Sequence, residues 1–354
     1  MKEIHLRPVE LVSPEWSIPQ VAEALYRALS GNGPALAFAP ISTESVPEEI
    51  AVVIPTSGST GQPKEVALTA AALISSARAS HTFLGAQIGD RWSLLLPLNH
   101  IAGVNVLVRA LELGVSVASR NEDAEFTAIV PTQLHRALHG DSELLAHLKN
   151  CKAVLVGGAE TTDESKQAAT DAGINIVTTY GMSEMSGGCV YNGTPLAGVS
   201  VKISEHGNIQ LQGAMMASGY LNSPELWNAT CIDGWFTTSD IGEFSDNHLT
   251  VLGRSDDQII SGGEKISLGT LEKFLTGVFP HQEFIAFGAP DLEWGTKLII
   301  ASNQNMDIEQ LRTSVKKELG QHAVPKDFLT LPEIPRTSLG KLDRTSARNI
   351  YLAK

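Results

Sequence analysis

The segment from Thr56 to Lys64 concentrates side chains that could bind a polyphosphate. It holds four hydroxyl residues, two glycines and one lysine, directly after an apolar stretch typical of a strand. Glycines let backbone N–H groups approach phosphate oxygens, hydroxyls donate hydrogen bonds to them, and the lysine adds a positive charge. Pro63 stands where a Walker-type loop needs glycine before the lysine, so we expect either a different phosphate loop or an ordinary polar turn. The candidate phosphate ligands are Thr56, Ser57, Gly58, Ser59, Thr60, Gly61 and Lys64.

Two further loops follow apolar, strand-like stretches. Residues 157–160 follow one of them, and residues 180–184 follow another. Ligands of parallel sheets bind beyond the carboxyl ends of the strands, so we expect these loops and the phosphate loop to meet. The carboxylate of Glu184 suits Mg²⁺, which takes one or two carboxylates together with phosphate oxygens, although a Ser-Glu pair after a strand is more often a helix cap. The other candidate nucleotide-binding residues here are Gly158, Ala159, Tyr180, Gly181, Met182 and Ser183.

The string of residues 56–64 resembles the phosphate loop of the acyl-adenylate-forming (AMP-binding) superfamily, which includes acyl- and aryl-CoA ligases, luciferases and adenylation domains. Residues 180–184 resemble its second signature. There the resemblance implies that an aromatic ring flanks adenine, a hydroxyl residue contacts phosphate and Glu184 binds magnesium. Glu65 departs from the pattern, because relatives usually have a small residue there, and its charge is tolerable near phosphate only if it points away.

Residues 238–242 resemble the ribose motif of the superfamily. The resemblance implies that Asp240 accepts hydrogen bonds from the ribose hydroxyls and that Arg254 also contacts ribose; the alternative for Asp240 is a simple turn. Asp256 matches the hinge residue about which a small domain rotates between the adenylating and thioester-forming poses.

The remaining two motifs lie towards the C-terminus. Gly262 and Gly263 match the glycine loop that lines the pantetheine tunnel of CoA ligases, although Lys265 replaces the more usual asparagine. Residues 335–341 resemble the last signature, whose lysine, here Lys341, stabilises charge on the carboxylate and α-phosphate. A cation on a loop of a mobile domain can be present for one half-reaction and absent for the other.

Two residues bear on the acid substrate. His100 occupies the place where aryl-CoA ligases carry a histidine at the acyl pocket. Arg109 lies in an otherwise apolar predicted helix, 104–111, where an unpaired charge is costly. We expect it to compensate, directly or through water, the ring carboxylate of a dicarboxylate acid; the alternatives are that it reaches solvent or pairs with Glu112. These segments, with residues 186–193 and the phosphate loop near the N-terminus, resemble 2-succinylbenzoate-CoA ligases of menaquinone synthesis in their compact bacterial form.

The resemblance implies an ATP-dependent, AMP-forming acid-thiol ligase. A small-molecule carboxylic acid attacks the α-phosphorus of Mg-ATP and expels pyrophosphate, and coenzyme A (CoA) then takes the acyl group. The expected ligands are therefore the acid, ATP, Mg²⁺ and CoA. The alternatives are another aryl- or acyl-CoA ligase and an adenylation enzyme that loads a carrier protein. A regulatory nucleotide-binding module without activity is disfavoured because all the charged motif residues are present.

Helix-like and strand-like segments alternate through the first half of the chain. Continuous apolar strands between helices indicate a largely parallel sheet that is covered on both faces. The expected strands are 51–54, 92–96, 115–118, 127–130, 153–156 and 174–178, and the expected helices are 17–29, 69–83, 131–139 and 163–172.

The pattern changes after Gly193 to short alternating strands and turns, and then to a mixture of helices and strands beyond Arg254. We therefore predict an α/β protein. Its large N-terminal domain has parallel sheets layered with helices plus a small antiparallel, barrel-like part, and a small mobile α+β domain follows. The predicted boundaries are 1–253 for the ATP- and acid-binding domain, 254–256 for the hinge and 257–354 for the C-terminal domain.

The composition excludes several classes of partner. The 354 residues carry 26 basic and 39 acidic side chains, a net charge of −13, without a basic run. Nucleic acids and anionic membranes need a positive footprint, so neither is an expected partner. There is no signal peptide pattern and no stretch that could span a bilayer, and three widely spaced cysteines suit reduced thiols. We expect a cytoplasmic protein, for which a homodimer is compatible with the sequence.

Overall fold

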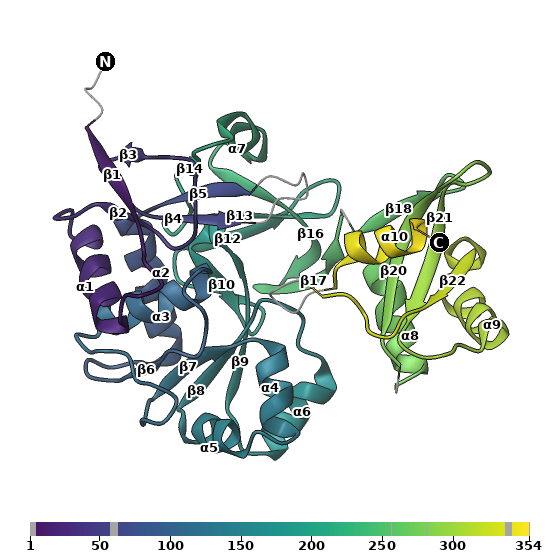
Figure 1. The fold of residues 1–354 in the computed structure, drawn as a ribbon, viewed down its shortest axis with the longest axis horizontal. Coiled ribbons are helices and arrows are strands. Elements are labelled where there is room, and N and C mark those ends of the chain that lie inside the picture. Colours follow the sequence, from purple (N-terminus) through teal and green to yellow (C-terminus); the bar gives the residue numbers. More distant parts are fainter. Residues whose placement is uncertain (1–4, 57–62, 256, 281, 337–341, 354) are drawn as a thin grey trace. The chain divides into compact units, whose positions relative to one another are not determined.

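Figure 1 shows the computed structural model of the chain, which describes residues 5–56, 63–255, 257–280, 282–336 and 342–353. The predicted site residues Ser57, Gly58, Ser59, Thr60, Gly61, Asp256 and Lys341 lie outside these ranges. The chain forms two compact units. The first comprises Met1–Lys202, Gln210–Thr237 and Phe244–Leu249, and the second comprises Ile203–Ile209, Thr238–Glu243 and Thr250–Lys354. The predicted hinge at 254–256 stays a prediction.

The first sheet has the strand order β14-β5-β4-β2-β1-β3. Strands β1, β2 and β4 run parallel, whereas β3, β5 and β14 pair antiparallel to their neighbours. Strands β4 and β5 form a hairpin, so the predicted phosphate loop connects two antiparallel strands. The strands are β1 (Leu6–Leu11), β2 (Ala35–Ala37), β3 (Ser45–Pro47), β4 (Ile50–Thr56), β5 (Lys64–Thr69) and β14 (Gly219–Tyr220).

The second sheet has the order β11-β10-β9-β8-β7-β6, in which β6 to β9 are parallel and β10 and β11 antiparallel. The predicted strand at 115–118 is wrong, because only Ala118 pairs, through one isolated bridge with Ser93. The predicted strand at 92–96 is shorter in the structure, because only Trp92 and Ser93 pair with β7. The strands are β6 (Trp92–Ser93), β7 (Phe126–Ile129), β8 (Ala153–Val156), β9 (Ile176–Met182), β10 (Gly187–Tyr191) and β11 (Thr194–Pro195).

Helices cover the faces of these sheets (Figure 1). Helix α2 (Ala70–Leu84) contacts β4 and β5 of the first sheet and β10 of the second, and α3 (Ile101–Glu112) contacts β6, β7 and β10. Helix α3 is buried almost all round because it lies among α1, α2 and the second sheet, which explains its apolar sequence. The other helices of this part are α1 (Ile18–Leu29), α4 (Pro131–Leu138), α5 (Ser142–Asn150), α6 (Asp163–Asp171) and α7 (Pro224–Thr230).

A third sheet follows, with the order β12-β13-β16-β15 and with β17 paired to β16. Its strands alternate between buried and exposed positions, as a sheet with one covered face requires. They are β12 (Val199–Ile203), β13 (Asn208–Gly213), β15 (Cys231–Ile232), β16 (Trp235–Ser245) and β17 (His248–Arg254).

The C-terminal part contains a hairpin and a three-stranded sheet, β20-β21-β22. Alternate residues of β20 point to opposite faces. Ala286 packs with α8 and α9, whereas Ile285 and Phe287 pack with α10. The elements are β18 (Gln258–Ser261), β19 (Glu264–Ser267), α8 (Leu268–Val278), β20 (Phe284–Asp291), β21 (Gly295–Ser302), α9 (Ile308–Leu319), β22 (Asp327–Thr330) and α10 (Arg344–Leu352).

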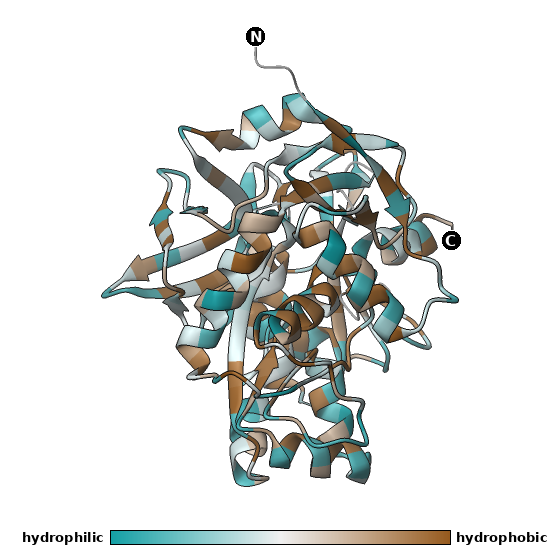
Figure 2. Ribbon diagram, turned by 90° about the vertical axis from the view of Figure 1, so that its left-hand side faces the viewer, coloured by the Kyte–Doolittle hydropathy of each residue, from teal (hydrophilic) through white to brown (hydrophobic). Residues whose placement is uncertain are grey.

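Figure 2, coloured by hydropathy, shows hydrophobic and hydrophilic residues alternating along the helices and strands. Within the described ranges, no helix combines the length and the hydrophobicity that crossing a bilayer requires. Layered, partly parallel sheets with helices, followed by a smaller α+β part, confirm the predicted α/β fold class.

Candidate functional site

The predicted phosphate loop starts and ends in the β4–β5 hairpin. Thr56 pairs directly with Lys64 in the antiparallel register, so both ends of the loop are fixed by the first sheet. Residues 57–62 lie outside the described residues. Lys64, predicted as the end of a loop, is the first residue of a strand, and its side chain is half-buried.

Asn222 clamps the strand that leaves this loop. Its Nδ2 donates to the carbonyl oxygen of Pro63 at 2.8 Å, and its Oδ1 accepts from the backbone N–H of Glu65 at 3.0 Å. The amide therefore holds the residues on both sides of Lys64, which fixes where that side chain starts.

The side chain of Glu65 is directed at the segment around Ser42. Its carboxylate is buried and accepts hydrogen bonds from the backbone and hydroxyl of Ser42 and from the hydroxyl of Thr43. Burial alone would raise the pKa of Glu65, but these hydrogen bonds outweigh it and hold the pKa below the usual value. The departure from the superfamily pattern thus has a structural role in tying the loop around Ser42 to β5.

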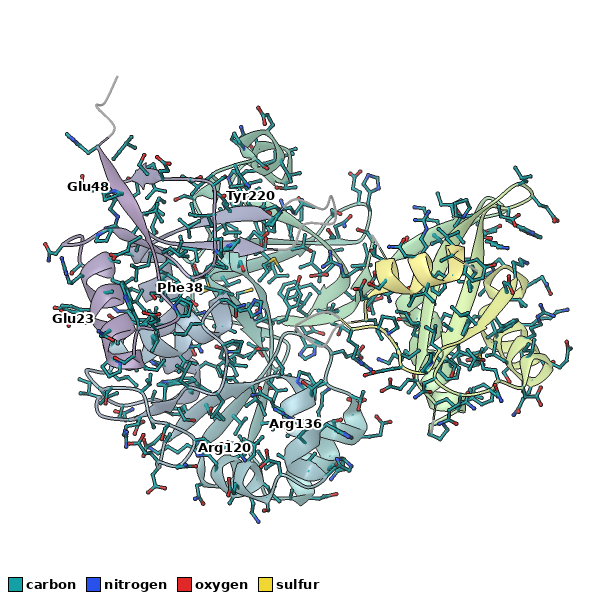
Figure 3. The ribbon with its side chains drawn as sticks, viewed as in Figure 1. Glu23, Phe38, Glu48, Arg120, Arg136 and Tyr220 are labelled. Carbon is teal, nitrogen blue, oxygen red and sulfur yellow. The ribbon has the colours of Figure 1, made fainter. Side chains whose placement is uncertain are left out.

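Tyr220, labelled in Figure 3, contacts both Lys64, a predicted phosphate ligand, and Glu184, the predicted magnesium ligand. Its hydroxyl donates to Oε1 of Glu184 at 2.7 Å, and Nζ of Lys64 lies 5.0 Å from the centre of its ring. Burial, and then the charge of Glu184, raises the pKa of Tyr220 far above its usual range, so the phenol stays a donor. One oxygen of Glu184 is oriented in this way, and a single oriented carboxylate fits a Mg²⁺ ion that is shared with phosphate oxygens.

Tyr180, Gly181 and Met182 lie in strand β9 and not in a loop, which corrects the prediction. The strand continues because β10 pairs with it as far as Met182. A Cβ on Gly181 would lie 2.0 Å from the carbonyl oxygen of Gly187 in β10, so only glycine fits this crossing. Ser183 and Glu184 follow in a short 3₁₀ turn, Ser183–Met185, in which Ser183 is buried.

The turn after Glu184 is anchored to the buried helices. The carbonyl oxygen of Ser186 accepts from Nδ2 of Asn105 at 2.6 Å and from Oγ of Ser76 at 3.2 Å. Ser186 adopts a left-handed conformation, with φ of 51°, which reverses the chain into β10. These contacts between α2, α3 and the turn fix the position of Glu184.

The loop after β8 lies against β9. A Cβ on Gly157 would lie 2.2 Å from Oγ1 of Thr179, so glycine permits this close approach. Gly158, with φ of 85°, and Ala159 are exposed at the end of the strand. Both residues are therefore accessible to a ligand.

His100 immediately precedes α3 and is half-buried. Its carbonyl oxygen accepts the backbone N–H groups of Gly103 and Val104. A Cβ on Gly103 would lie 2.2 Å from the carbonyl oxygen of Pro97, so glycine allows the preceding loop to fold onto the first turn of the helix. The helix start and this loop together fix the backbone at His100.

Arg109 is buried at 3% exposure, which excludes the alternative that it reaches solvent. Its Nη2 donates to the hydroxyl of Tyr191 at 3.0 Å, and its Cζ lies 4.8 Å from the ring centre of Trp92. The alternative partner, Glu112, instead accepts from Nε of Arg78 at 2.6 Å. Arg109 therefore carries a buried charge that is held by a neutral phenol and an aromatic face.

In the second unit, Asp240 and Arg254 lie together. Nη1 of Arg254 is 3.3 Å from Oδ1 of Asp240, across strands β16 and β17. The backbone N–H of Asp240 donates to Oγ1 of Thr238 at 3.0 Å, and Asp240 is half-buried. The structure thus brings together the two residues for which a shared ribose role was predicted.

Gly262 and Gly263 form the two-residue turn of the β18–β19 hairpin. Both have positive φ angles, 58° and 87°, as the tightest hairpin turns require. A Cβ on Gly262 would lie 2.8 Å from the ring of Trp294. Both glycines and Lys265 are exposed.

Arg344 connects the chain just after residue 256 with the chain just after residue 341. Its Nη1 lies 3.0 Å from Oδ1 of Asp257, and its Nη2 lies 2.6 Å from Oε2 of Glu272 in α8. The start of α10 is thereby tied to the N-terminal end of this part of the chain.

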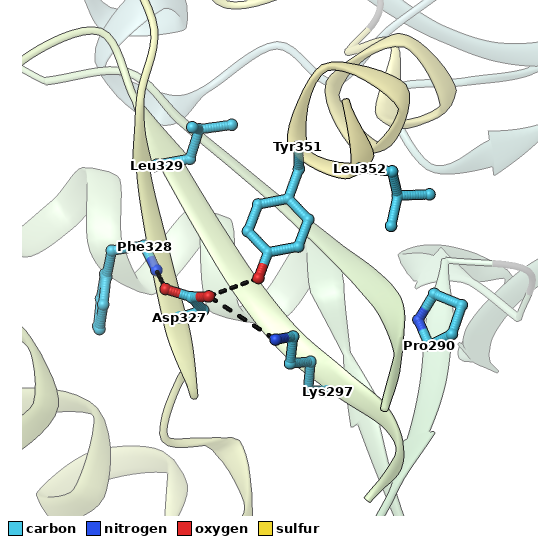
Figure 4. A pocket seen from close by; sticks show the side chains of 7 residues that line it. All are labelled: Pro290, Lys297, Asp327, Phe328, Leu329, Tyr351 and Leu352. Atoms are coloured by element: carbon cyan, nitrogen blue, oxygen red, sulfur yellow. Dashed lines mark hydrogen bonds and ion pairs between the residues drawn. The ribbon is translucent and has the colours of Figure 1, made fainter. Parts of the chain in front are cut away.

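A surface pocket of the C-terminal part, drawn in Figure 4, contains none of the predicted residues. Oδ2 of Asp327 accepts a hydrogen bond from the hydroxyl of Tyr351, and Nζ of Lys297 lies 3.7 Å from the same oxygen. These polar groups satisfy each other, so they hold α10 against β21 and β22.

Four contributors to the site were missed from the sequence. Each acts through a contact with a residue far away in the chain, and no local pattern marks such a contact. The sequence offered one signal for these residues, namely a tyrosine or asparagine close to a motif or within an apolar segment. The four are Asn105, Tyr191, Tyr220 and Asn222.

Comparison with known proteins identifies the family. Residues 9–221 match the model of the AMP-binding enzyme family. A probable 2-succinylbenzoate-CoA ligase of Mycobacterium tuberculosis is 36% identical over 91% of this chain and 93% of that protein. The 2-succinylbenzoate-CoA ligase of Escherichia coli is 31% identical over 78% of this chain and 64% of its own.

Solved structures agree with the fold. Escherichia coli MenE with a bound phenylether-linked analogue of OSB-AMS has a TM-score of 0.73 and 25% identity, over 97% of this chain and 82% of that one. The o-succinylbenzoate CoA synthetase of Bacillus subtilis in complex with the acyl-adenylate intermediate OSB-AMP has a TM-score of 0.75 at 23% identity, over 96% of this chain and 83% of that one, and supports the fold alone. The chain belongs to the AMP-binding enzyme family, as an ATP-dependent, AMP-forming acid-CoA ligase.

Proposed function

We propose that the protein is a 2-succinylbenzoate-CoA ligase, which adenylates 2-succinylbenzoate with ATP and Mg²⁺ and transfers the acyl group to CoA in menaquinone synthesis. The observation that carries this proposal is Arg109, a buried cation without a carboxylate partner among the described residues. A second, non-reacting carboxylate of the substrate would compensate its charge, directly or through water. Relatives that span nearly the whole chain bear this name.

In the first half-reaction, the substrate carboxylate attacks the α-phosphorus of ATP, and the bond to the β-phosphate breaks to release pyrophosphate. Positioning of the reactants and neutralisation of their charge provide the catalysis. Lys64 and the backbone and hydroxyls of residues 56–61 hold the phosphates, and His100 lines the acyl pocket. Mg²⁺ on Glu184 would neutralise phosphate charge, and Tyr220 orients that carboxylate. Lys341 stabilises charge on the reacting carboxylate and α-phosphate.

The adenosine part has its own candidate residues. The ring of Tyr180 flanks adenine, and Asp240 with Arg254 accepts and donates hydrogen bonds at the ribose. The backbone at Gly158, Ala159, Gly181, Met182 and Ser183 completes the nucleotide site.

In the second half-reaction, the C-terminal part turns about Asp256 and Lys341 withdraws. The CoA thiolate then attacks the acyl-adenylate beside the turn Gly262–Gly263, expelling AMP. The exposure of this turn is compatible with a pantetheine chain passing over it.

We place the enzyme in the cytoplasm. The unpaired cysteines Cys151, Cys189 and Cys231 suit a reducing compartment. A homodimer is the oligomeric form to test, by light scattering of the purified protein.

The test is an acid panel with ATP, Mg²⁺ and CoA, read by pyrophosphate release and by free acyl-CoA. The panel compares 2-succinylbenzoate with 3-benzoylpropionate, which lacks only the ring carboxylate, and with benzoate. We expect kcat/KM to be highest for 2-succinylbenzoate. Equal use of the acids would contradict the substrate assignment, and pyrophosphate without acyl-CoA would favour an enzyme that loads a carrier protein.

A further inference from the structure

Arg109 is held by groups that orient it without neutralising it. Its only described hydrogen-bond acceptor is the hydroxyl of Tyr191, and Trp92 packs against the guanidinium. Among the described residues, Nε of Arg109 is buried without a hydrogen-bond partner. A carboxylate in place of the phenol would fix the same orientation but would also satisfy the charge.

The direction of the hydrogen bonds at Tyr191 follows from the chemistry of arginine. A guanidinium only donates, so the phenol oxygen must accept from Arg109. The phenol proton is then available for Oγ of Ser80, which lies 3.0 Å away. Tyr191 and Ser80 are both fully buried, and Phe83 packs edge-on against the tyrosine ring, with the ring centres 5.3 Å apart.

The neighbouring histidine does not compete for an anion as a second cation. Burial, and then the charge of Arg109, lowers the pKa of His81 to about 4, whereas Asp90 opposes this shift. His81 is therefore neutral at neutral pH, and Arg109 is the buried positive charge of this cluster.

We infer that Tyr191 is a positioning residue for substrate specificity, whose hydroxyl aims the guanidinium of Arg109 at the non-reacting carboxylate of a dicarboxylate acid. The inference rests on the proposed function, because it needs a substrate with a second carboxylate. It goes further than the proposed function, because it assigns the preference for dicarboxylate over monocarboxylate acids to Tyr191 of β10 as well as to Arg109 of α3.

The test compares wild type with Tyr191→Phe, which removes one oxygen atom and keeps the ring. The same preparation is assayed with 2-succinylbenzoate and with 3-benzoylpropionate. We expect kcat/KM for the dicarboxylate to fall about tenfold, mainly through KM, since a hydrogen bond to a charged group is lost. For the monocarboxylate, kcat/KM should stay within about twofold of the wild-type value.

The ratio of the two kcat/KM values does not depend on how much of the variant is folded, so a loss of stability leaves the test valid. Ser80→Ala, which removes only the group that receives the phenol proton, should lower the ratio less. Tyr26→Phe is the matched control, because Tyr26 lies exposed on α1 and should leave the ratio unchanged.

The outcomes separate the two proposals. An unchanged ratio in Tyr191→Phe, or an equal loss with both acids, would overturn the positioning role while the proposed function stands. A wild-type enzyme that does not prefer 2-succinylbenzoate over 3-benzoylpropionate would overturn the proposed function, and the inference with it.

Discussion

The hydroxyl of Tyr220 donates a hydrogen bond of 2.7 Å to Oε1 of Glu184. The two residues are far apart in the chain and meet because strand β14 pairs with β5, next to the turn that carries Glu184. The backbone N–H of Ala217 also donates to the carbonyl oxygen of Glu184, at 2.8 Å. The segment before and within β14 therefore fixes both the backbone and the carboxylate of Glu184.

Replacing Tyr220 with phenylalanine should weaken magnesium-dependent adenylation. Without the phenol, the carboxylate of Glu184 loses its orientation, and we expect kcat/KM for Mg-ATP to fall about tenfold, as for loss of one charge-assisted hydrogen bond. Pyrophosphate release should need more Mg²⁺ for half-maximal rate. Tyr351→Phe removes a similar tyrosine-carboxylate bond, to Asp327, and should leave the Mg²⁺ requirement unchanged. A Tyr220→Phe enzyme with wild-type Mg²⁺ dependence would contradict the role.

Replacing Glu65 with glutamine should destabilise the first sheet. The carboxylate accepts several hydrogen bonds from Ser42 and Thr43, and an amide accepts fewer, so we expect a loss of roughly 1–3 kcal/mol in the free energy of unfolding. Urea unfolding at pH 7 measures this. Glu205→Gln, at an exposed position, is the control, and equal stability of both variants would show that the buried carboxylate contributes nothing.

Because the pKa of Glu65 is lowered in the folded protein, the loss of unfolding free energy in Glu65→Gln should depend on pH. A carboxylate whose pKa is depressed on folding stabilises the protein above its unfolded pKa, and this stabilisation is lost as the pH falls through the folded value. The difference in unfolding free energy between wild type and Glu65→Gln should therefore shrink in acid. A difference that stays constant between pH 7 and acid would disagree with this assignment.

Local sequence patterns predicted the elements whose signals are local. Thr69 marked the start of α2, and its side chain caps the helix by accepting from the backbone of Ala72. The expected helix 131–139 matches α4, which begins with Pro131 at its first position. These signals lie within a few residues of the element that they define.

Local patterns gave wrong secondary structure where strands pair with segments that are distant in the sequence. Residues 180–182 were assigned to a loop because the expected strand ended at residue 178, yet β10 pairs with them and extends the strand. Lys64 was assigned to a loop because it ends the glycine- and hydroxyl-rich string 56–64, although β4 and β14 both flank its strand. The motifs identified Lys64 and Glu184 as candidate site residues. Tyr220 and Asn222, which hold these two residues in place, were not identified because their contacts form only in the folded chain.

His81 should make the stability of the protein depend on mild acidity. Burial and Arg109 lower its pKa from 6.5 to about 4, so between these values the unfolded chain binds a proton that the folded chain does not. Stability should therefore fall as the pH decreases from 7 to 5, by about 2 kcal/mol for this group. His81→Gln should flatten this slope in urea unfolding, whereas His206→Gln, at an exposed position, should not. Identical slopes in all three proteins would refute the assignment.

Replacing Lys341 with alanine should separate the two half-reactions. The lysine is proposed to stabilise the developing charge only during adenylation, so we expect pyrophosphate release to slow about a hundredfold or more, the cost of losing one electrostatic stabiliser. Thioester formation from supplied acyl-adenylate and CoA should proceed at nearly the wild-type rate, because Lys341 has then withdrawn. Lys317→Ala, at an exposed position on α9, controls for the general loss of a positive charge and should affect neither step. If both steps slowed equally in Lys341→Ala, the lysine would act in both half-reactions. The proposal that rotation about Asp256 removes Lys341 from the site before thioester formation would then be wrong.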